Sequence, residues 1–251
     1  MRIVTKAKIL NFFGLFNFIR SIIYRRDLYN PKVLNFYRSF IQEDSLCFDV
    51  GANIGRVTDI LLRLGARVIA IEPNPECVRY LRLKYRFNKK VVVVPQAIDA
   101  AVGKKNLYVC EVNSLSTLAP DWIKACKDSQ RLSEFNWDKK VEVYVTTLDY
   151  LIKEYGRPNY IKIDVEGNEF SVLKGLSKSV SLVSLEICPE TIVSTQNCIN
   201  YLSSLGEVRF NLSSGETSEE FELPNWIRAT DMAIYLKEKL RYGYLWGRFT
   251  F

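Results

Sequence analysis

The fold is decided by the stretch Cys47-Phe48-Asp49-Val50-Gly51-Ala52-Asn53-Ile54-Gly55. Residues 46–50 form a short apolar run with one acid in it, which is typical of a buried strand. Two glycines four residues apart follow, and apolar residues then recur at helical spacing until Gly65. The stretch therefore predicts a strand, a glycine-rich turn and a helix. Such a turn lets the backbone approach a ligand closely, and the start of the helix offers free N–H groups.

A second strand is predicted over residues 66–71, and the acid Glu72 follows it directly. Glu72 lies 21 residues after Gly51, a spacing that places an acid where it can bind a ribose hydroxyl pair. The pattern G-A-N-I-G lacks the third glycine of a G-x-G-x-x-G dinucleotide site. Two alternatives remain at this turn, namely an NAD site and a plain strand–turn–helix that binds no ligand.

The composition is that of one globular α/β domain of ordinary size. The chain has 251 residues, of which 48% are hydrophobic and 25% are charged. Its net charge is +7 and its pI is about 9.0, and the basic residues are dispersed along the chain. A solvated basic face explains this balance; an anionic partner such as nucleic acid or a membrane surface is the alternative. The sequence carries no signal for an oligomeric state.

The cysteine and histidine content limits which catalytic and metal-binding sites the chain can form. None of the six cysteines forms a C-x-x-C pair, which indicates free buried thiols in a reducing, cytoplasmic compartment. The chain has no histidine, which excludes Ser-His-Asp and Cys-His nucleophilic sites and all His-ligated zinc sites. Any base must therefore be Asp, Glu, Lys, Tyr or water.

Residues 1–40 differ from the rest because basic residues alternate there with aliphatic and aromatic ones. The apolar run is interrupted by Asn11, Gly14 and Asn17, and is too short for a transmembrane helix. We expect a helical extension that packs on the domain or forms part of a lid. The alternative is a peripheral membrane contact through residues 1–26. The predicted limits are 1–40 for this extension, 41–240 for the domain and 241–251 for an aromatic tail.

The second informative stretch is residues 160–167, a predicted strand that runs into two acids and a glycine. Strands and helices alternate along the chain, which predicts a mostly parallel, doubly wound sheet. Ligands bind beyond the carboxyl ends of the strands in such a sheet. Four acids fall at or near these ends: Asp49, Glu72, Asp164 and Glu186. The last two strands are predicted from the runs at residues 207–212 and 231–236.

These stretches together resemble the FkbM family of S-adenosylmethionine (SAM) dependent methyltransferases. The turn with Asp49 two residues before its first glycine resembles methyltransferase motif I, which binds a nucleoside and no pyrophosphate. The more specific match is Lys-Ile-Asp-Val-Glu-Gly at 162–167, followed by Leu-Lys-Gly at 173–175. Residues 71–75 and 147–149 also match, and the resemblance spans roughly residues 45–190. It implies a class I methyltransferase with a Rossmann-like, seven-stranded sheet whose last strand is antiparallel.

The resemblance implies SAM as the cofactor, and seven residues are expected to bind it: Asp49, Gly51, Asn53, Gly55, Glu72, Gln96 and Ala97. After the third strand the family often has alanine, a small residue, serine and aspartate. This chain has Ala97 and Ile98 followed by Asp99, so the residue that contacts the adenine is left open.

The function implied is O-methylation of a hydroxyl on a small molecule, sugar or glycan, with no specific nucleic-acid partner. An RNA methyltransferase is the first alternative, because the chain is basic and mixes Lys and Arg with Tyr and Trp. Against it, no Asn-Pro-Pro-Tyr platform for a flipped base follows the fourth strand. A non-catalytic nucleoside-binding or membrane-associated protein is the second alternative.

Asp164 and Glu166 are the candidate catalytic residues. They lie two apart at the end of a strand, so their side chains can project to the same side. A carboxylate with a pKa raised by partial burial is then the best available base for an alcohol. Alternatively, one of them only caps the next helix or pairs with Lys162, and the base is Glu186, Tyr160 or water. A Mg²⁺ ion held by these oxygens remains an alternative, but the spacing does not demand one, so no metal site is predicted.

Overall fold

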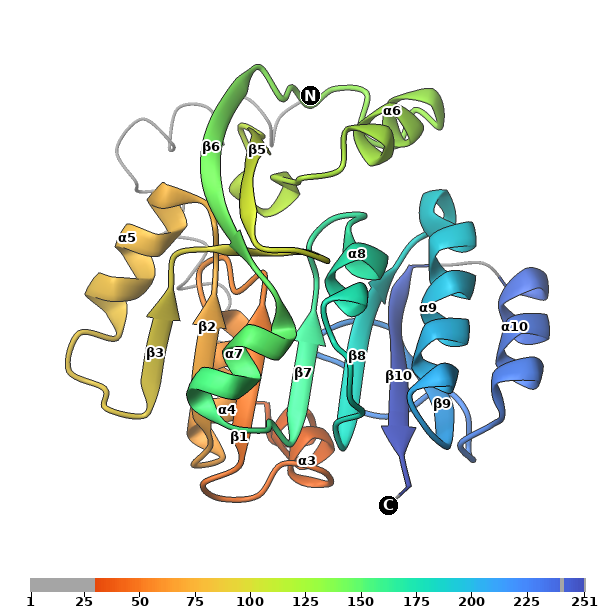
Figure 1. Ribbon diagram of the computed structural model, residues 1–251. Coiled ribbons are helices and arrows are strands. Elements are labelled where there is room, and N and C mark those ends of the chain that lie inside the picture. The colour runs from red at the N-terminus through yellow and green to blue at the C-terminus, as the bar shows by residue number, and fades with distance from the viewer. Residues whose placement is uncertain (1–29, 240–241, 251) are drawn as a thin grey trace.

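The computed structural model describes residues 30–239 and 242–250. Its central sheet has seven strands in the order β3-β2-β1-β7-β8-β10-β9 (Figure 1). The strands are β1 (Leu46–Val50), β2 (Arg67–Ile71), β3 (Val91–Val94), β7 (Tyr160–Ile163), β8 (Leu182–Ile187), β9 (Val208–Ser213) and β10 (Gly243–Phe249). β10 runs antiparallel to both neighbours, and the other pairs are parallel. The predicted seven-stranded, doubly wound α/β fold is confirmed.

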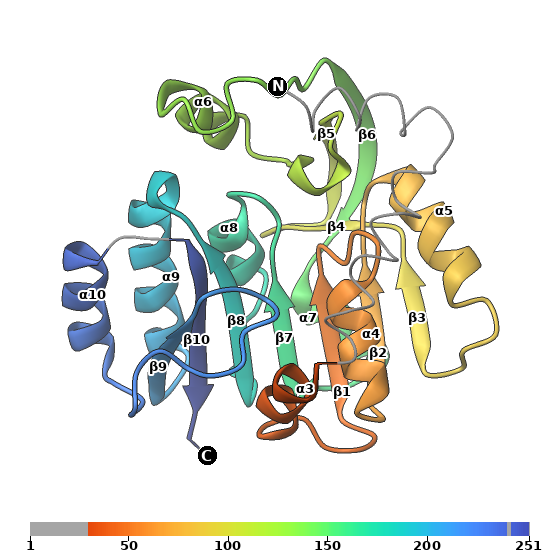
Figure 2. The ribbon, with the colours of Figure 1, turned by 180° about the vertical axis from the view of Figure 1, so that it is seen from behind.

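Helices cover both faces of this sheet, as the two opposite views show (Figures 1 and 2). One face carries α3 (Pro31–Arg38), α4 (Arg56–Arg63) and α5 (Pro75–Lys84). The other carries α7 (Leu148–Tyr155), α8 (Glu169–Lys174), α9 (Ile192–Ser204) and α10 (Ala229–Glu238), and the short helix η2 (Pro189–Thr191) precedes α9. Each face has its own apolar core, as the continuous hydrophobic character of the buried strands requires.

A second, smaller sheet lies beyond the carboxyl ends of the central strands (Figure 1). Its order is β4-β6-β5, from β4 (Ala97–Ile98), β5 (Gly103–Val109) and β6 (Lys139–Thr146). The short helices η1 (Asn113–Leu115) and α6 (Pro120–Asp128) lie between β5 and β6. We call residues 97–146 the cap. Trp122 and Trp137 pack edge to face in its own small core, at a centroid distance of 6.1 Å.

The carboxyl-terminal part of the chain differs from the prediction in two ways. Residues 231–236, predicted to be a strand, lie in helix α10, where Met232 and Leu236 are buried four residues apart on one face. The missing strand is β10, within the segment 241–251 that was predicted to be a tail. Trp246 at its centre is fully buried between β8 and β9. A short apolar run does not by itself distinguish a strand from a buried helix.

The amino-terminal extension is described only from residue 30 onward. Phe36 and Tyr37 of α3 are buried and pack against Trp246, with ring centroids 5.5 and 6.3 Å away. The predictions for residues 1–26, packing and membrane contact alike, lie outside the described residues. Among residues 30–239 and 242–250, no helix has the length and apolar character needed to cross a bilayer.

Candidate functional site

A pocket lies between the carboxyl ends of the central strands and the cap. Seven of the nine predicted site residues line it: Gly51, Asn53, Glu72, Gln96, Ala97, Asp164 and Glu166. Besides Ala97, the cap contributes residues 98, 107, 113, 114 and 116–118, and β8 contributes Glu186. Asp49 and Gly55, both predicted to bind the cofactor, are not among the lining residues. The turn after β1 and the acids after β7 therefore share one cavity.

The turn after β1 needs glycine at residue 51. Gly51 has φ of +78°, and a Cβ atom there would lie 1.8 Å from the carbonyl oxygen of Asp164. The N–H groups of Gly51 and Ala52 both donate to the carbonyl oxygen of Ile71, at 3.0 Å. The glycine thus brings the β1 turn against the backbone that carries Asp164.

Glu72 connects the turn after β1 to the residues that follow β2. One carboxylate oxygen accepts from the N–H of Asn53 and the other from the N–H of Asn74, each at 2.8 Å. Burial raises the pKa of Glu72 to about 7, although these two N–H donors lower it. Each oxygen retains a lone pair that can accept a further hydrogen bond from a ligand hydroxyl.

Asp49 and Gly55 do not line the pocket but stabilise the turn through hydrogen bonds on its other side. Asp49 is fully buried, and its Oδ2 accepts from the N–H and the hydroxyl of Thr58 at 3.0 and 2.6 Å. Gly55 has φ of +78°, and its carbonyl accepts from the hydroxyl of Tyr85 at 3.0 Å. Asp49 therefore holds α4 against β1, and Gly55 holds the start of α4 against the end of α5.

Lys162 joins the turn to the acids that follow β7. Its buried ammonium group lies 3.2 Å from Asp164 Oδ2, 3.5 Å from Asp49 Oδ1 and 3.3 Å from the carbonyl oxygen of Gly51. Burial acts to lower the pKa of Lys162, but the carboxylates of Asp164 and Asp49 raise it overall. Lys162 is therefore held as a cation. The hydroxyl of Tyr244, on β10, donates to the same Oδ2 of Asp164.

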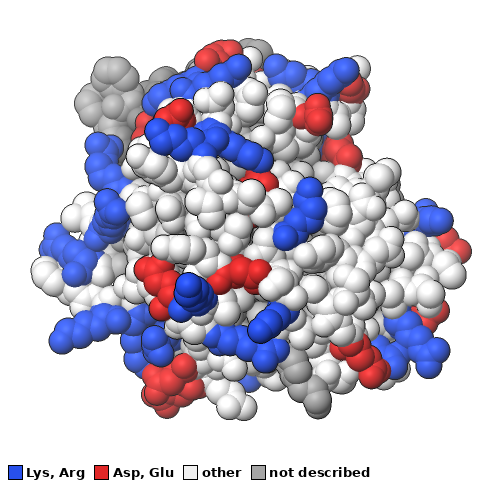
Figure 3. Space-filling view, in the orientation of Figure 1, with Lys and Arg blue, Asp and Glu red and all other residues white. Residues whose placement is uncertain are grey.

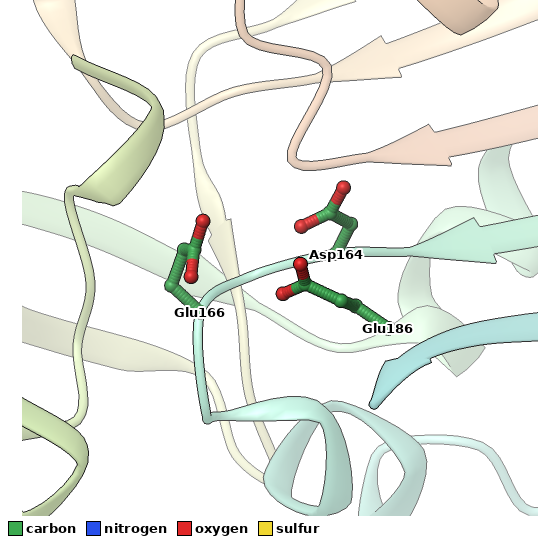
Figure 4. A group of neighbouring side chains, drawn as sticks. All are labelled: Asp164, Glu166 and Glu186. Atoms are coloured by element: carbon green, nitrogen blue, oxygen red, sulfur yellow. The ribbon is translucent and has the colours of Figure 1, made fainter. Parts of the chain in front are cut away.

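Three carboxylates meet at the end of this network, as Figure 4 shows: Asp164, Glu166 and Glu186. One oxygen from each lies within 4.8 Å of the others. Burial, reinforced by the charge of Asp164, raises the pKa of Glu166 and of Glu186 well above 4.5. Carboxylates this close can share protons or hold a divalent cation, but crowding alone does not identify a metal site.

The loop that carries Glu166 is shaped by Glu169. The Oε1 atom of Glu169 accepts from the N–H groups of Val165 and Gly167 at 3.1 and 3.2 Å. Glu166 itself has φ of +56°, and a cap residue, Thr117, donates its hydroxyl to the Glu166 carbonyl at 2.6 Å. The alternative that Glu166 caps the helix is wrong, because the N-cap of α8 is Asn168 and no side chain makes a capping hydrogen bond there. The pairing of Asp164 with Lys162 is observed.

Three side chains beside Asp164 were not among the nine predicted site residues: Lys162, Glu186 and Tyr244. Of these, Lys162 was named only as an alternative partner and Glu186 only as an alternative base. Lys162 precedes Asp164 by two residues and shares its side of the strand, which is a usable signal. Glu186 ends a strand, as the other acids do. No feature of the sequence indicated that Tyr244 contacts the site, because it lies 80 residues from Asp164 in sequence and on a strand that the pattern did not predict.

Comparison with known proteins gives a family and a relative. Residues 49–214 match the methyltransferase FkbM domain. Hexuronic acid methyltransferase AglP of Haloferax volcanii is 29% identical over 150 residues, which cover 58% of this chain and 57% of that protein. The match thus spans little more than half the length of this relative. The methyl donor of a protein with this domain is SAM, as predicted.

Two solved structures are similar to this chain at low sequence identity. The TehB-like SAM-dependent methyltransferase of Corynebacterium glutamicum has a TM-score of 0.47 and 9% identity, covering 93% of this chain and 97% of that one. Fibrillarin of Aeropyrum pernix, solved with bound SAM, has a TM-score of 0.43 and 9% identity, covering 83% of this chain and 68% of that one.

Proposed function

This chain belongs to the FkbM methyltransferase family, and on that premise we propose that it methylates a hydroxyl oxygen of a sugar or glycan. The observation that carries the proposal is the shared pocket, in which the glycine turn and Glu72 face the same cavity as Asp164, Glu166 and Glu186. A methyl donor on the turn would thus lie beside candidate bases for an alcohol.

The residues around the turn fit SAM. We assign Glu72 to the ribose hydroxyls, and Gln96 and Ala97 to the side of the pocket that receives the adenine. The pocket also contains a buried amide nitrogen, Nδ2 of Asn113, that has no hydrogen-bond partner among the described residues. Five acids line the pocket against two cations, Arg56 and Lys162. When bound, SAM supplies an electrophilic methyl group on a positively charged sulfur, which this excess of carboxylates favours.

In this proposal the acids have different roles toward the acceptor. Asp164 is fixed by Lys162 and Tyr244, so in this proposal it accepts a hydrogen bond from the acceptor hydroxyl and orients it. Glu166, with Glu186 beside it, takes the proton, because its raised pKa makes it a stronger base than an ordinary carboxylate. The acceptor oxygen forms a bond to the methyl carbon as the carbon–sulfur bond breaks. The products are a methyl ether, S-adenosylhomocysteine and a protonated glutamate.

A sugar acceptor is supported by the name of the Haloferax relative, a hexuronic acid methyltransferase. The acids of the pocket also suit the hydroxyl groups of a sugar, since carboxylates accept hydrogen bonds from them. They favour neutral sugars over uronates, because a uronate carboxylate would be placed near charges of its own sign.

The proposal is tested with purified protein and SAM that carries a deuterated methyl group. The acceptors are neutral hexosides, hexuronates and short glycans, and mass spectrometry detects the labelled product. We expect label on an oxygen of at least one carbohydrate, removed when that hydroxyl is replaced by hydrogen. Label found only on nitrogen or on added RNA would contradict the proposal. Calorimetry with SAM alone separates a missing acceptor from a failure of donor binding.

A further inference from the structure

We propose that the end of α5 and the turn that follows it form a docking surface for an anionic lipid membrane. Two large apolar side chains are exposed there: Leu83, with 62% of its surface exposed, and Phe87, with 84%. They lie four residues apart and line one shallow depression with Arg86 and Lys89. We call these four residues, together with Arg82, the α5 surface. No residue of this surface lines the pocket described above.

Every charged residue in the segment that carries Leu83 and Phe87 is basic. Residues 77–98 include six cations and no acid, which is a large share of the excess of basic residues in the whole chain. Two of these cations are neutralised locally, since Lys84 pairs with Asp59 at 2.5 Å and Lys90 with Asp44 at 3.0 Å. In Figure 3, Lys and Arg side chains gather along the flank of the molecule where α5 lies.

The remaining four cations, Arg79, Arg82, Arg86 and Lys89, are exposed and form no ion pair with any residue within 30–239 or 242–250. The guanidinium group of Arg86 lies 4.6 Å from the centroid of the Phe87 ring. An exposed aromatic side chain beside unpaired cations matches a lipid interface, where the ring enters the acyl boundary and the cations meet anionic headgroups.

The side chains of the α5 surface favour a membrane over single-stranded RNA as the occupant. The second apolar side chain, Leu83, is aliphatic and has no ring on which a base could stack. Single-stranded nucleic acid is held in a groove between several stacking platforms, whereas this shallow depression offers a single aromatic side chain, Phe87. The α5 surface lies on the outer flank of the sheet, between α5 and the start of β3 (Figure 1), and none of its residues lines the pocket. Docking through this surface therefore uses no residue of the pocket.

The test is co-sedimentation of the full chain with vesicles of phosphatidylcholine alone or mixed with phosphatidylglycerol. We expect binding only to the mixed vesicles, weakened by salt. The double variants Leu83→Ser/Phe87→Ser and Arg82→Gln/Arg86→Gln should each lower the partition coefficient by about tenfold or more. The matched control is Val193→Ser/Ile234→Ser, which alters side chains that are 72% and 59% exposed on α9 and α10. This control should bind as the wild type does.

Calorimetry with SAM on each variant keeps this test separate from the catalytic proposal, because the α5 surface contributes nothing to the pocket. Unchanged SAM affinity shows that a variant that has lost vesicle binding is still folded. Absence of wild-type binding to the mixed vesicles would overturn the proposal, as would wild-type binding that both double variants retain. Binding of polyuridylate that the variants lose, without any vesicle binding, would reassign the surface to nucleic acid.

Discussion

The ammonium group of Lys162 lies 3.2 Å from Oδ2 of Asp164, in a position where only 4% of the Lys162 side chain is exposed. The same nitrogen lies 3.5 Å from Asp49 and 3.3 Å from the carbonyl oxygen of Gly51. One buried cation thus connects the acid before the turn, the turn itself and the acid of the proposed acceptor site. Breaking a buried network of this kind leaves uncompensated charge.

Replacement of Lys162 by Met should therefore be strongly destabilising. We expect a loss of about 3–5 kcal/mol in the free energy of unfolding, measured by urea denaturation, because Asp49 and Asp164 lose their shared cation. The exposed pair Lys104–Glu142 supplies the control, and Lys104→Met should change stability little. The double variant Lys162→Met/Asp164→Asn should lose less than the sum of the single losses. Full additivity would mean that the two groups do not interact.

Gly51 allows a second structural test. Gly51→Ala places a Cβ 1.8 Å from the Asp164 carbonyl oxygen at a φ of +78°, so we expect at least about 2 kcal/mol of destabilisation and a large loss of SAM affinity. Gly103→Ala is the matched control, because no atom lies within 4 Å of its Cβ position. Denaturation and calorimetry on both variants check this. Equal behaviour of the two would mean that the turn can relax away from Asp164.

The glycine turn and the acids at the strand ends were predictable because their signals are local. The spacing of Gly51, Gly55 and Glu72 specifies a strand, a turn and a second strand within one short segment. Similarly, Asp164 and Glu166 are marked by their place at the end of an apolar run. These features need no knowledge of the distant chain.

Features that depend on distant contacts could not be predicted in this way. Tyr244 reaches Asp164 only because β10 inserts between β8 and β9, and nothing near residue 244 specifies that pairing. The residues of α10 include the short continuous apolar run 232–236, and such a run does not by itself distinguish a strand from a buried helix. The burial of Asp49 likewise depends on how α4 packs over β1, and Thr58 of α4 supplies two hydrogen bonds that compensate for it.

Glu72 should make SAM binding depend on pH. Its pKa in the folded protein is raised to about 7 by burial, well above its value in the unfolded chain. Its contribution to the stability of the free protein is therefore present at low pH and is lost as the pH rises through about 7. Ribose hydroxyls donate to the ionised form, so SAM affinity should change in the opposite sense and fall as the pH drops from 8 to 6.

The measurement is calorimetry with SAM across this pH range, on the wild type and on Glu72→Gln. The variant should bind more weakly and lose the part of the pH dependence that Glu72 contributes, because its amide does not titrate there. The titration of SAM itself is common to both proteins and cancels in the comparison. Identical pH profiles would show that Glu72 does not contact the bound nucleoside.

The chemistry is tested by three isosteric variants of the carboxylate cluster, compared with the wild type on the labelled acceptor. Glu166→Gln should retain SAM binding and lower turnover by about 10²-fold or more, as expected for removal of a general base. Asp164→Asn should lower turnover to a similar extent and also raise the KM for the acceptor, because it orients the hydroxyl. Glu186→Gln should have the smallest effect on turnover.

The pH profile distinguishes the base from its neighbours. Burial and the charge of Asp164 place the pKa of Glu166 well above 4.5, so wild-type turnover should rise with pH through that raised pKa, as Glu166 becomes ionised. Glu166→Gln should abolish this rise. Glu186→Gln should only move it to lower pH, because removing a neighbouring acid favours ionisation of Glu166. If the rise instead disappears in Glu186→Gln and persists in Glu166→Gln, the base is Glu186, and near-wild-type turnover in all three variants would exclude the carboxylate cluster from proton transfer.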